Sequence, residues 1–87
     1  MTNSHLADFI ENKLVPKLAN QGRNTDRASY WIQALRNNEV TGSHQWRNLA
    51  TIIYGFSTVF GISSNAELAY CAERGNYQTR FYGNLVV

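Results

Sequence analysis

The stretch from Trp46 to Ile62, WRNLATIIYGFSTVFGI, is the longest mostly apolar run in the chain, and its only formal charge is Arg47. Placed on a helix, its large apolar residues recur at spacings of three and four. A helix that is apolar on most of its sides belongs inside a protein. The sequence therefore predicts a central buried helix at about 44–60, with an inner stripe formed by Trp46, Leu49, Ala50, Ile53, Phe56 and Phe60.

The ends and the interior of this stretch bear on the prediction. Ser43 is suited to cap the helix start, and Gly61 is suited to end it in the left-handed conformation. Gly55 costs a helix about 1 kcal/mol relative to alanine, so we expect a neighbouring backbone to approach closely there. Two strands broken at Gly55 are the alternative. A membrane span is disfavoured, because the run is shorter than the ~20 apolar residues required.

Three further helices are expected around the central one. Ser4 would cap the first helix. Pro16 lies in the interior of that helix, so the helix either kinks at Pro16 or stops near Lys13 and resumes. Thr25 would cap a second helix that stops at 37–38, and Ser64 with Glu67 forms a capping-box pattern before a last helix that ends at Gly75. Their inner faces would contain Leu6, Phe9, Ile10, Leu14 and Leu18; Ala28, Trp31, Ile32 and Leu35; and Leu68, Cys71 and Ala72.

The fold class predicted is all-α: a compact bundle of about four helices around the central apolar helix, in a single domain over residues 1–87. The tail from Tyr77 alternates weakly and suggests a short extended C-terminal segment. Its last three residues, Leu85, Val86 and Val87, are apolar, so we expect them to dock on the core or on a second subunit.

The cysteine count and the N-terminus indicate a cytoplasmic protein, of a bacterium or of a virus that infects one. Cys71 is the sole cysteine, which excludes a disulfide framework and suits a reducing compartment. The polar N-terminus lacks the pattern of a signal peptide. The net charge of +2 arises from basic residues that are spread along the chain and interleaved with acids, which is weak evidence for an anionic partner.

No residue pattern predicts catalysis, a metal site or a cofactor, and we expect a protein that is not an enzyme. His5 and His44 are far apart and have no ligand partner at helical spacing. Cys71 lies on an inner helix face, where packing is the simpler role. Asp8 and Glu11 share one helix face, and solvation explains them without a paired-carboxylate mechanism.

A protein partner is the binding role that the composition favours. Tyrosine, tryptophan and arginine supply most of the binding energy at protein interfaces. We therefore predict a small protein-binding module, an inhibitor or regulator of the phage or plasmid type that acts by covering a partner's surface. The candidate contact residues are Arg27, Tyr30, Arg36, Arg47, Tyr77, Arg80 and Tyr82.

Two other functions remain open at this point. The central and last helices resemble a helix-turn-helix in outline, which would suit a nucleic acid, although Glu67 and Glu73 oppose phosphates. Arg23, Arg27, Arg36 and Arg47, with the lysines of the first helix, would be the better contacts for a nucleic acid. The third function is structural self-assembly, such as a homodimer that pairs through an extended C-terminal edge.

Overall fold

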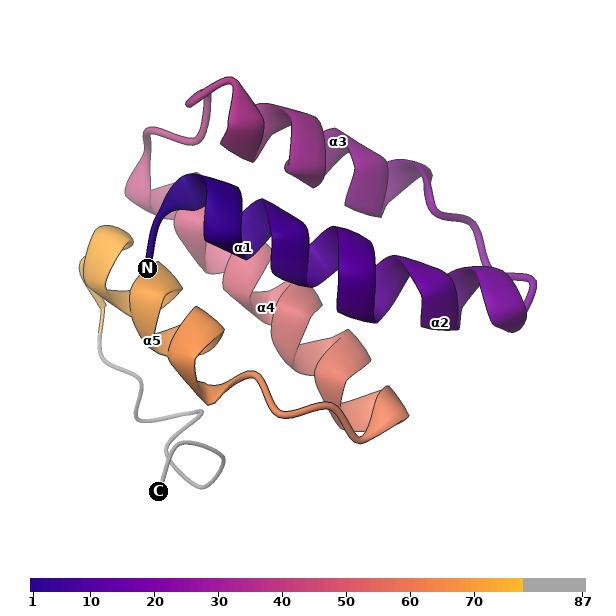
Figure 1. Ribbon diagram of the computed structural model, residues 1–87. Coiled ribbons are helices and arrows are strands. Elements are labelled where there is room, and N and C mark those ends of the chain that lie inside the picture. Colours follow the sequence, from indigo (N-terminus) through magenta and orange to yellow (C-terminus); the bar gives the residue numbers. More distant parts are fainter. Residues whose placement is uncertain (78–87) are drawn as a thin grey trace. The chain divides into compact units, whose positions relative to one another are not determined.

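The computed structural model describes residues 1–77, and within them the chain is helical and contains no strand (Figure 1). The all-α prediction is confirmed, with helical segments at residues 3–20, 26–36, 43–60 and 65–74. Contacts divide the chain into two compact units, one comprising Met1–Val40 and the other beginning at Thr41. The single domain expected over residues 1–87 stays a prediction.

The first segment of the first unit is a continuous helix that changes register in the middle. It consists of α1 (Asn3–Phe9), a π-helical turn η1 (Ile10–Leu14) and α2 (Val15–Asn20). Residues spaced by four drift around an α-helix, which has 3.6 residues per turn. A π turn holds more residues per turn and corrects that drift. As a result the predicted stripe stays aligned and is fully buried at Leu6, Ile10, Leu14 and Leu18, with Phe9 half-buried.

The π turn also shows how the helix accommodates Pro16. The N–H of Val15 donates to the carbonyl of Ile10, five residues back, and Pro16 then falls in the first turn of α2. A proline is tolerated there because its missing N–H has no helical partner in any case. The helix therefore neither stops near Lys13 nor needs a separate start. The predicted cap at Ser4 is wrong, because the hydroxyl of Thr2 accepts from the N–H of His5 at 3.2 Å.

Helix α3 (Asp26–Arg36) lies antiparallel to the first segment and packs against α1 and η1 (Figure 1). Its predicted inner face is buried at Ala28, Trp31, Ile32 and Leu35. Thr25 occupies the N-cap position as expected, but its side chain makes no cap bond. Asn24 supplies that acceptor instead, since its Oδ1 lies 2.7 Å from the N–H of Asp26.

Helix α4 (Ser43–Phe60) is the predicted central helix, and it packs against α5 (Asn65–Arg74) in the second unit (Figure 1). The helix prediction is confirmed and the two-strand alternative is wrong. The helix is buried along one face, not on most of its sides. Trp46, Leu49, Ala50 and Ile53 are buried, Phe56 and Phe60 are half-buried, and Val59 is 58% exposed.

Two details at the start and middle of α4 correct the sequence interpretation. The N-cap is Gly42 and not Ser43, and the side-chain oxygen of Gln45 accepts from the N–H groups of Thr41 and Gly42, each at 3.0 Å. No backbone of residues 1–77 approaches Gly55, because a Cβ built there would have none of their atoms outside its own helix backbone within 4 Å. The glycine is therefore an uncompensated weak point in the helix.

Helix α5 begins after Ser64, as expected, and buries Leu68, Cys71 and Ala72. The predicted capping box does not form, because the Ser64 side chain makes no cap bond. Gly75 follows the helix, but the left-handed residue is Asn76, with φ of 53°.

All four helical segments end with the same hydrogen bond. One residue adopts a positive φ, and the N–H that follows it donates to the carbonyl five positions back, which is the Schellman arrangement. The positive-φ residues are Gly22, Asn38, Gly61 and Asn76, and the bonds are Arg23 to Leu18, Glu39 to Ala34, Ile62 to Ser57 and Tyr77 to Ala72. The predicted stops near 38 and at Gly61 are thereby confirmed.

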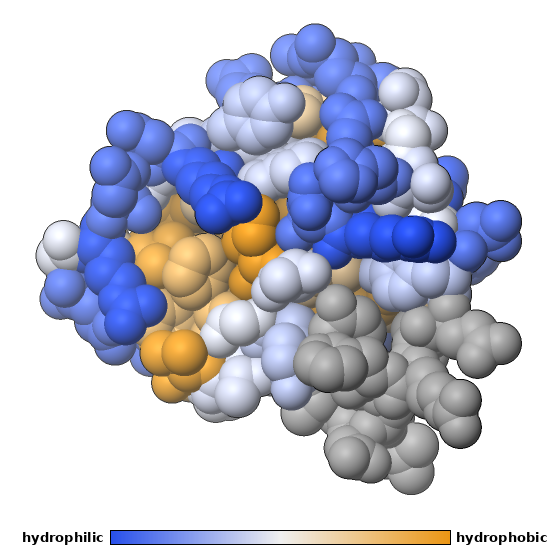
Figure 2. All heavy atoms as spheres, turned by 180° about the vertical axis from the view of Figure 1, so that it is seen from behind, coloured by the Kyte–Doolittle hydropathy of each residue, from blue (hydrophilic) through white to orange (hydrophobic). Residues whose placement is uncertain are grey.

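No helix among residues 1–77 combines the length and apolarity needed to cross a membrane. The expectations for the tail, an extended segment and a docked apolar end, lie outside the described residues. Figure 2 shows one face on which hydrophobic atoms reach the surface among hydrophilic ones. In the part described, the exposed large hydrophobic residues are Met1, Tyr30 and Val59.

Gly55 inside α4 and Gly61 at its C-cap should respond in opposite directions to substitution by alanine. Gly55→Ala should raise the free energy of unfolding by about 1 kcal/mol, because alanine loses less backbone entropy than glycine in a helix interior. The added Cβ also has space, since it would meet no described atom within 4 Å. Gly61→Ala should lower it by about 1 kcal/mol, because a Cβ is strained at φ of 67°. Urea unfolding followed by circular dichroism measures both. A loss of stability in Gly55→Ala would show that this position has a packing role.

Candidate functional site

Two arginines and three aromatic rings gather in the second unit, where the start of α4 meets the end of α5. The buried ring of Trp46 meets Tyr70 edge-on, with centroids 5.7 Å apart and an interplanar angle of 82°. Arg74 lies over Tyr70, its Cζ 4.4 Å from the ring centroid and 5.9 Å from that of Trp46. Arg47 lies over Tyr77 at 5.6 Å. We call these five residues the arginine–aromatic cluster.

The local sequence explains how the cluster forms. Tyr70 and Arg74 are four residues apart on α5, which places them on the same helix face. Gly75 leaves room for the ring of Tyr77, since a Cβ at Gly75 would lie only 2.5 Å from Cε1 of that ring. The positive φ of Asn76 turns the chain at this point. The small residue and the left-handed residue together bring Tyr77 back against the end of α5.

The charges of the cluster are not neutralised by carboxylates within residues 1–77. Arg47 and Arg74 are exposed, and neither forms an ion pair in that part of the chain. An exposed cation stacked over an aromatic ring gains roughly 0.5–1 kcal/mol, which restrains the arginine side chain. A guanidinium has five N–H donors, so stacking on a ring leaves donors available for an incoming acceptor.

Arg36, by contrast, is already occupied. Its Nη2 lies 2.9 Å from Oδ1 of Asp8 and 3.4 Å from Oε2 of Glu11, so it links α3 to α1 and η1. The hydrogen bond to Asp8 is the main reason that the pKa of Arg36 is raised above its ordinary value. Asp8 and Glu11 were expected to be merely solvated, and the structure gives them this partner. The role of Arg36 in binding a partner stays a prediction.

The other candidates in the first unit lie on the outer side of α3. Tyr30 is 58% exposed, and its ring meets the buried Trp31 edge-on at 5.3 Å. Arg27 is exposed three residues earlier, and it has no ion pair among the residues described. Arg27 and Tyr30 are three residues apart on α3 and so lie near one another on the helix surface, whereas Arg47 lies directly over the Tyr77 ring. Arg80 and Tyr82 lie outside the described residues.

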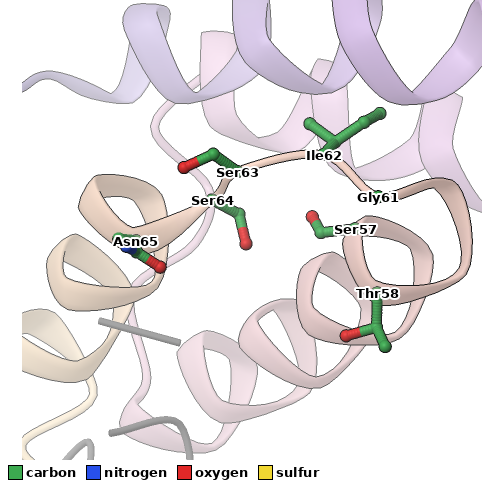
Figure 3. Close-up of a pocket in the computed structure, with 7 residues that line it drawn as sticks. All are labelled: Ser57, Thr58, Gly61, Ile62, Ser63, Ser64 and Asn65. Atoms are coloured by element: carbon green, nitrogen blue, oxygen red, sulfur yellow. The ribbon is translucent and has the colours of Figure 1, made fainter. Parts of the chain in front are cut away.

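Sequence reasoning missed Arg74 and the pocket next to the α4–α5 turn. The spacing of four between Tyr70 and Arg74 could have indicated that Arg74 stacks on a tyrosine. The pocket has a volume of about 400 Å³ and includes Ser57, Gly61, Ile62, Ser63, Ser64 and Asn65 in its walls (Figure 3). No pattern in the sequence marks it, because its hydroxyls come from a helix end, a turn and a helix start.

The residues considered for chemistry occupy ordinary positions. Cys71 is fully buried, and burial raises the pKa of its thiol to about 12, with a smaller contribution from the charge of Glu67. A thiol in this environment is protonated at neutral pH and is a poor nucleophile. His44 is exposed, with Nε2 3.5 Å from Nδ2 of Asn48. Within residues 1–77, no three potential ligand side chains converge as a metal site requires.

No protein-family model, curated protein or solved structure matches this chain.

The burial of Cys71 should make stability depend on pH in the alkaline range. The folded thiol keeps its proton to about pH 12, whereas an unfolded one loses it near pH ~8.5. Unfolding therefore releases a proton between these values, and the free energy of unfolding falls as the pH rises. Between about pH 7.5 and about pH 10 the fall should be about 2 kcal/mol.

Urea unfolding of the wild type and of Cys71→Ala at both pH values isolates this effect, because other groups titrate in both proteins. The wild type should lose more stability than the variant over that interval. Equal losses would show that Cys71 does not titrate differently on unfolding.

Proposed function

We propose that this chain is a small, cytoplasmic, non-enzymatic protein-binding module, an inhibitor or regulator of the phage or plasmid type that acts by covering a partner's surface. The single observation that supports it best is the pair of exposed arginines, Arg47 and Arg74, each held over an aromatic ring and neither paired with a carboxylate in residues 1–77. Arginine and tyrosine are the residue types that most often dominate binding energy.

Restraint of the two arginines favours association. A long side chain that is ordered on binding costs roughly 0.5–1.5 kcal/mol, and stacking on a ring reduces this cost in advance. The available N–H donors form their strongest hydrogen bonds with carboxylates. The partner surface that fits the cluster therefore presents acidic side chains. Tyr30 and Arg27 give the first unit a second contact surface of similar composition.

The proposal is tested by affinity capture from the native host with the full chain as bait. We expect a stoichiometric protein partner, and its affinity should fall at least about 30-fold in the double variant Arg47→Ala, Arg74→Ala, since hot-spot truncation costs ~2 kcal/mol or more. The double variant Lys17→Ala, Arg23→Ala is the matched control, because it also removes two positive charges, from exposed side chains outside the cluster. Calorimetry with the purified partner gives the affinities.

Two results would count against the proposal. The first is the recovery of no stoichiometric partner. The second is an equal loss of affinity in the control Lys17→Ala, Arg23→Ala, which would indicate general charge attraction instead of a defined surface. Thermal unfolding of each variant verifies that it is folded.

Nucleic-acid binding is the weaker alternative. Helices α4 and α5 are joined by residues 61–64, a connection as short as that of a helix-turn-helix. The second helix of such a motif enters a groove lined with phosphates. Here that helix carries an exposed Glu73 and a half-buried Glu67, and its Arg74 is stacked on Tyr70. Phosphates would be repelled by the two acids.

We therefore expect no salt-sensitive binding to a labelled duplex or single strand at low ionic strength. Fluorescence anisotropy at two salt concentrations measures this, because phosphate contacts weaken steeply as salt rises. Binding that weakens with salt would favour the nucleic-acid function over the protein-binding one. Self-assembly through the C-terminal residues stays a prediction, and sedimentation at high concentration tests it.

A further inference from the structure

The pocket next to the α4–α5 turn contains a hydroxyl with no hydrogen-bond partner. Ser57 is only 2% exposed, and its Oγ is closed to solvent and unpaired. In Figure 3 the Ser57 side chain points from α4 toward the turn, and the Ser64 hydroxyl points into the same space from the other side. An unsatisfied buried hydroxyl costs roughly 1–3 kcal/mol, so its presence requires an explanation.

The start of α5 contributes further donors to this space. The first N–H groups of a helix have no acceptor within the helix, and here they belong to Asn65, Ala66 and Glu67. The Ser64 side chain, which normally caps such a start, makes no cap bond. The backbone carbonyl of Ser64 accepts the regular helical hydrogen bond from the N–H of Leu68, at 2.9 Å. A helix start with free donors attracts an anion.

We propose that this pocket binds a small oxyanion, held by the N–H groups at the start of α5, by the Ser64 hydroxyl and by the Ser57 hydroxyl, which turns toward the ligand by rotation about Cα–Cβ because its Oγ is closed to solvent. The volume of about 400 Å³ is at the small end of ligand pockets. Hydrogen-bond donors from a buried side chain and from a helix start point into the pocket. A carboxylate or phosphate oxygen is an acceptor that can bind all of these donors. This site is separate from the arginine–aromatic cluster and does not depend on the proposed function.

The charges around the pocket limit the ligand. Among residues 1–77, none of those that line the pocket is a lysine or arginine. The carboxylate of Glu67 lies in the first turn of α5 and opposes a negative ligand. The oxyanion is therefore small and carries a single charge, and it binds weakly. Ile62 supplies an apolar wall that accommodates a short organic group.

Amide chemical shifts provide the direct test. Sodium acetate and inorganic phosphate are titrated separately into the ¹⁵N-labelled full chain at constant ionic strength, with sodium chloride as the control. We expect saturable shifts at Asn65, Ala66 and Glu67 with an oxyanion and none with chloride. Saturation at lower acetate concentration assigns a carboxylate ligand, and saturation at lower phosphate concentration assigns a phosphate group.

Two variants show whether the site has the proposed composition. Ser57→Ala should melt at a higher temperature than the wild type without ligand, because the unpaired hydroxyl is gone, and should lose the saturable shifts. Glu67→Gln should bind the oxyanion several-fold more tightly. The absence of saturable shifts in the wild type would overturn the proposal. So would shifts unchanged in Ser57→Ala, or binding no tighter in Glu67→Gln.

Discussion

The left-handed residue at the end of each helix is the constraint on which both units depend. A helix leaves its last carbonyls without partners, and the hydrogen bond to the carbonyl five positions back satisfies one of them at every helix end described. Gly22 and Gly61 do this just before the chain reverses into the next helix, so α1–α2 meets α3 and α4 meets α5 after short connections. The apolar stripes then pack within each pair, and the arginine–aromatic cluster forms where the second pair begins and ends.

The sequence was sufficient for what depends on periodicity and insufficient for what depends on single hydrogen bonds. Spacings of three and four located all four helical segments and nearly all of their buried faces, because burial imposes that period. Helix starts were shifted or differently capped, since Thr2, Asn24 and Gln45 compete with the expected acceptors through local geometry. A pattern analysis that assumes 3.6 residues per turn could not predict the π turn before Pro16. The neighbours of Gly55 depend on how the helices pack, which residue spacing alone does not define.

The candidate site followed the same division. Residue type predicted that arginines and tyrosines would be exposed; Arg47 is exposed, whereas the Tyr77 ring beneath it is half-buried. Residue type alone could not distinguish Arg36, which two carboxylates occupy, from Arg47 and Arg74, which lie over rings. That difference depends on which helices pack together. The Ser57 pocket needs three segments to be placed in space, and no linear pattern encodes it.

The pairing of helices that follow one another along the chain has a consequence for the speed of folding. The helix contacts of each unit join segments close in sequence, so little loop entropy is lost before those contacts form. Helical proteins with such local topology reach the native state in microseconds to milliseconds. A chain of this design passes quickly through the unfolded ensemble, which limits the time its apolar stripes spend in water during synthesis.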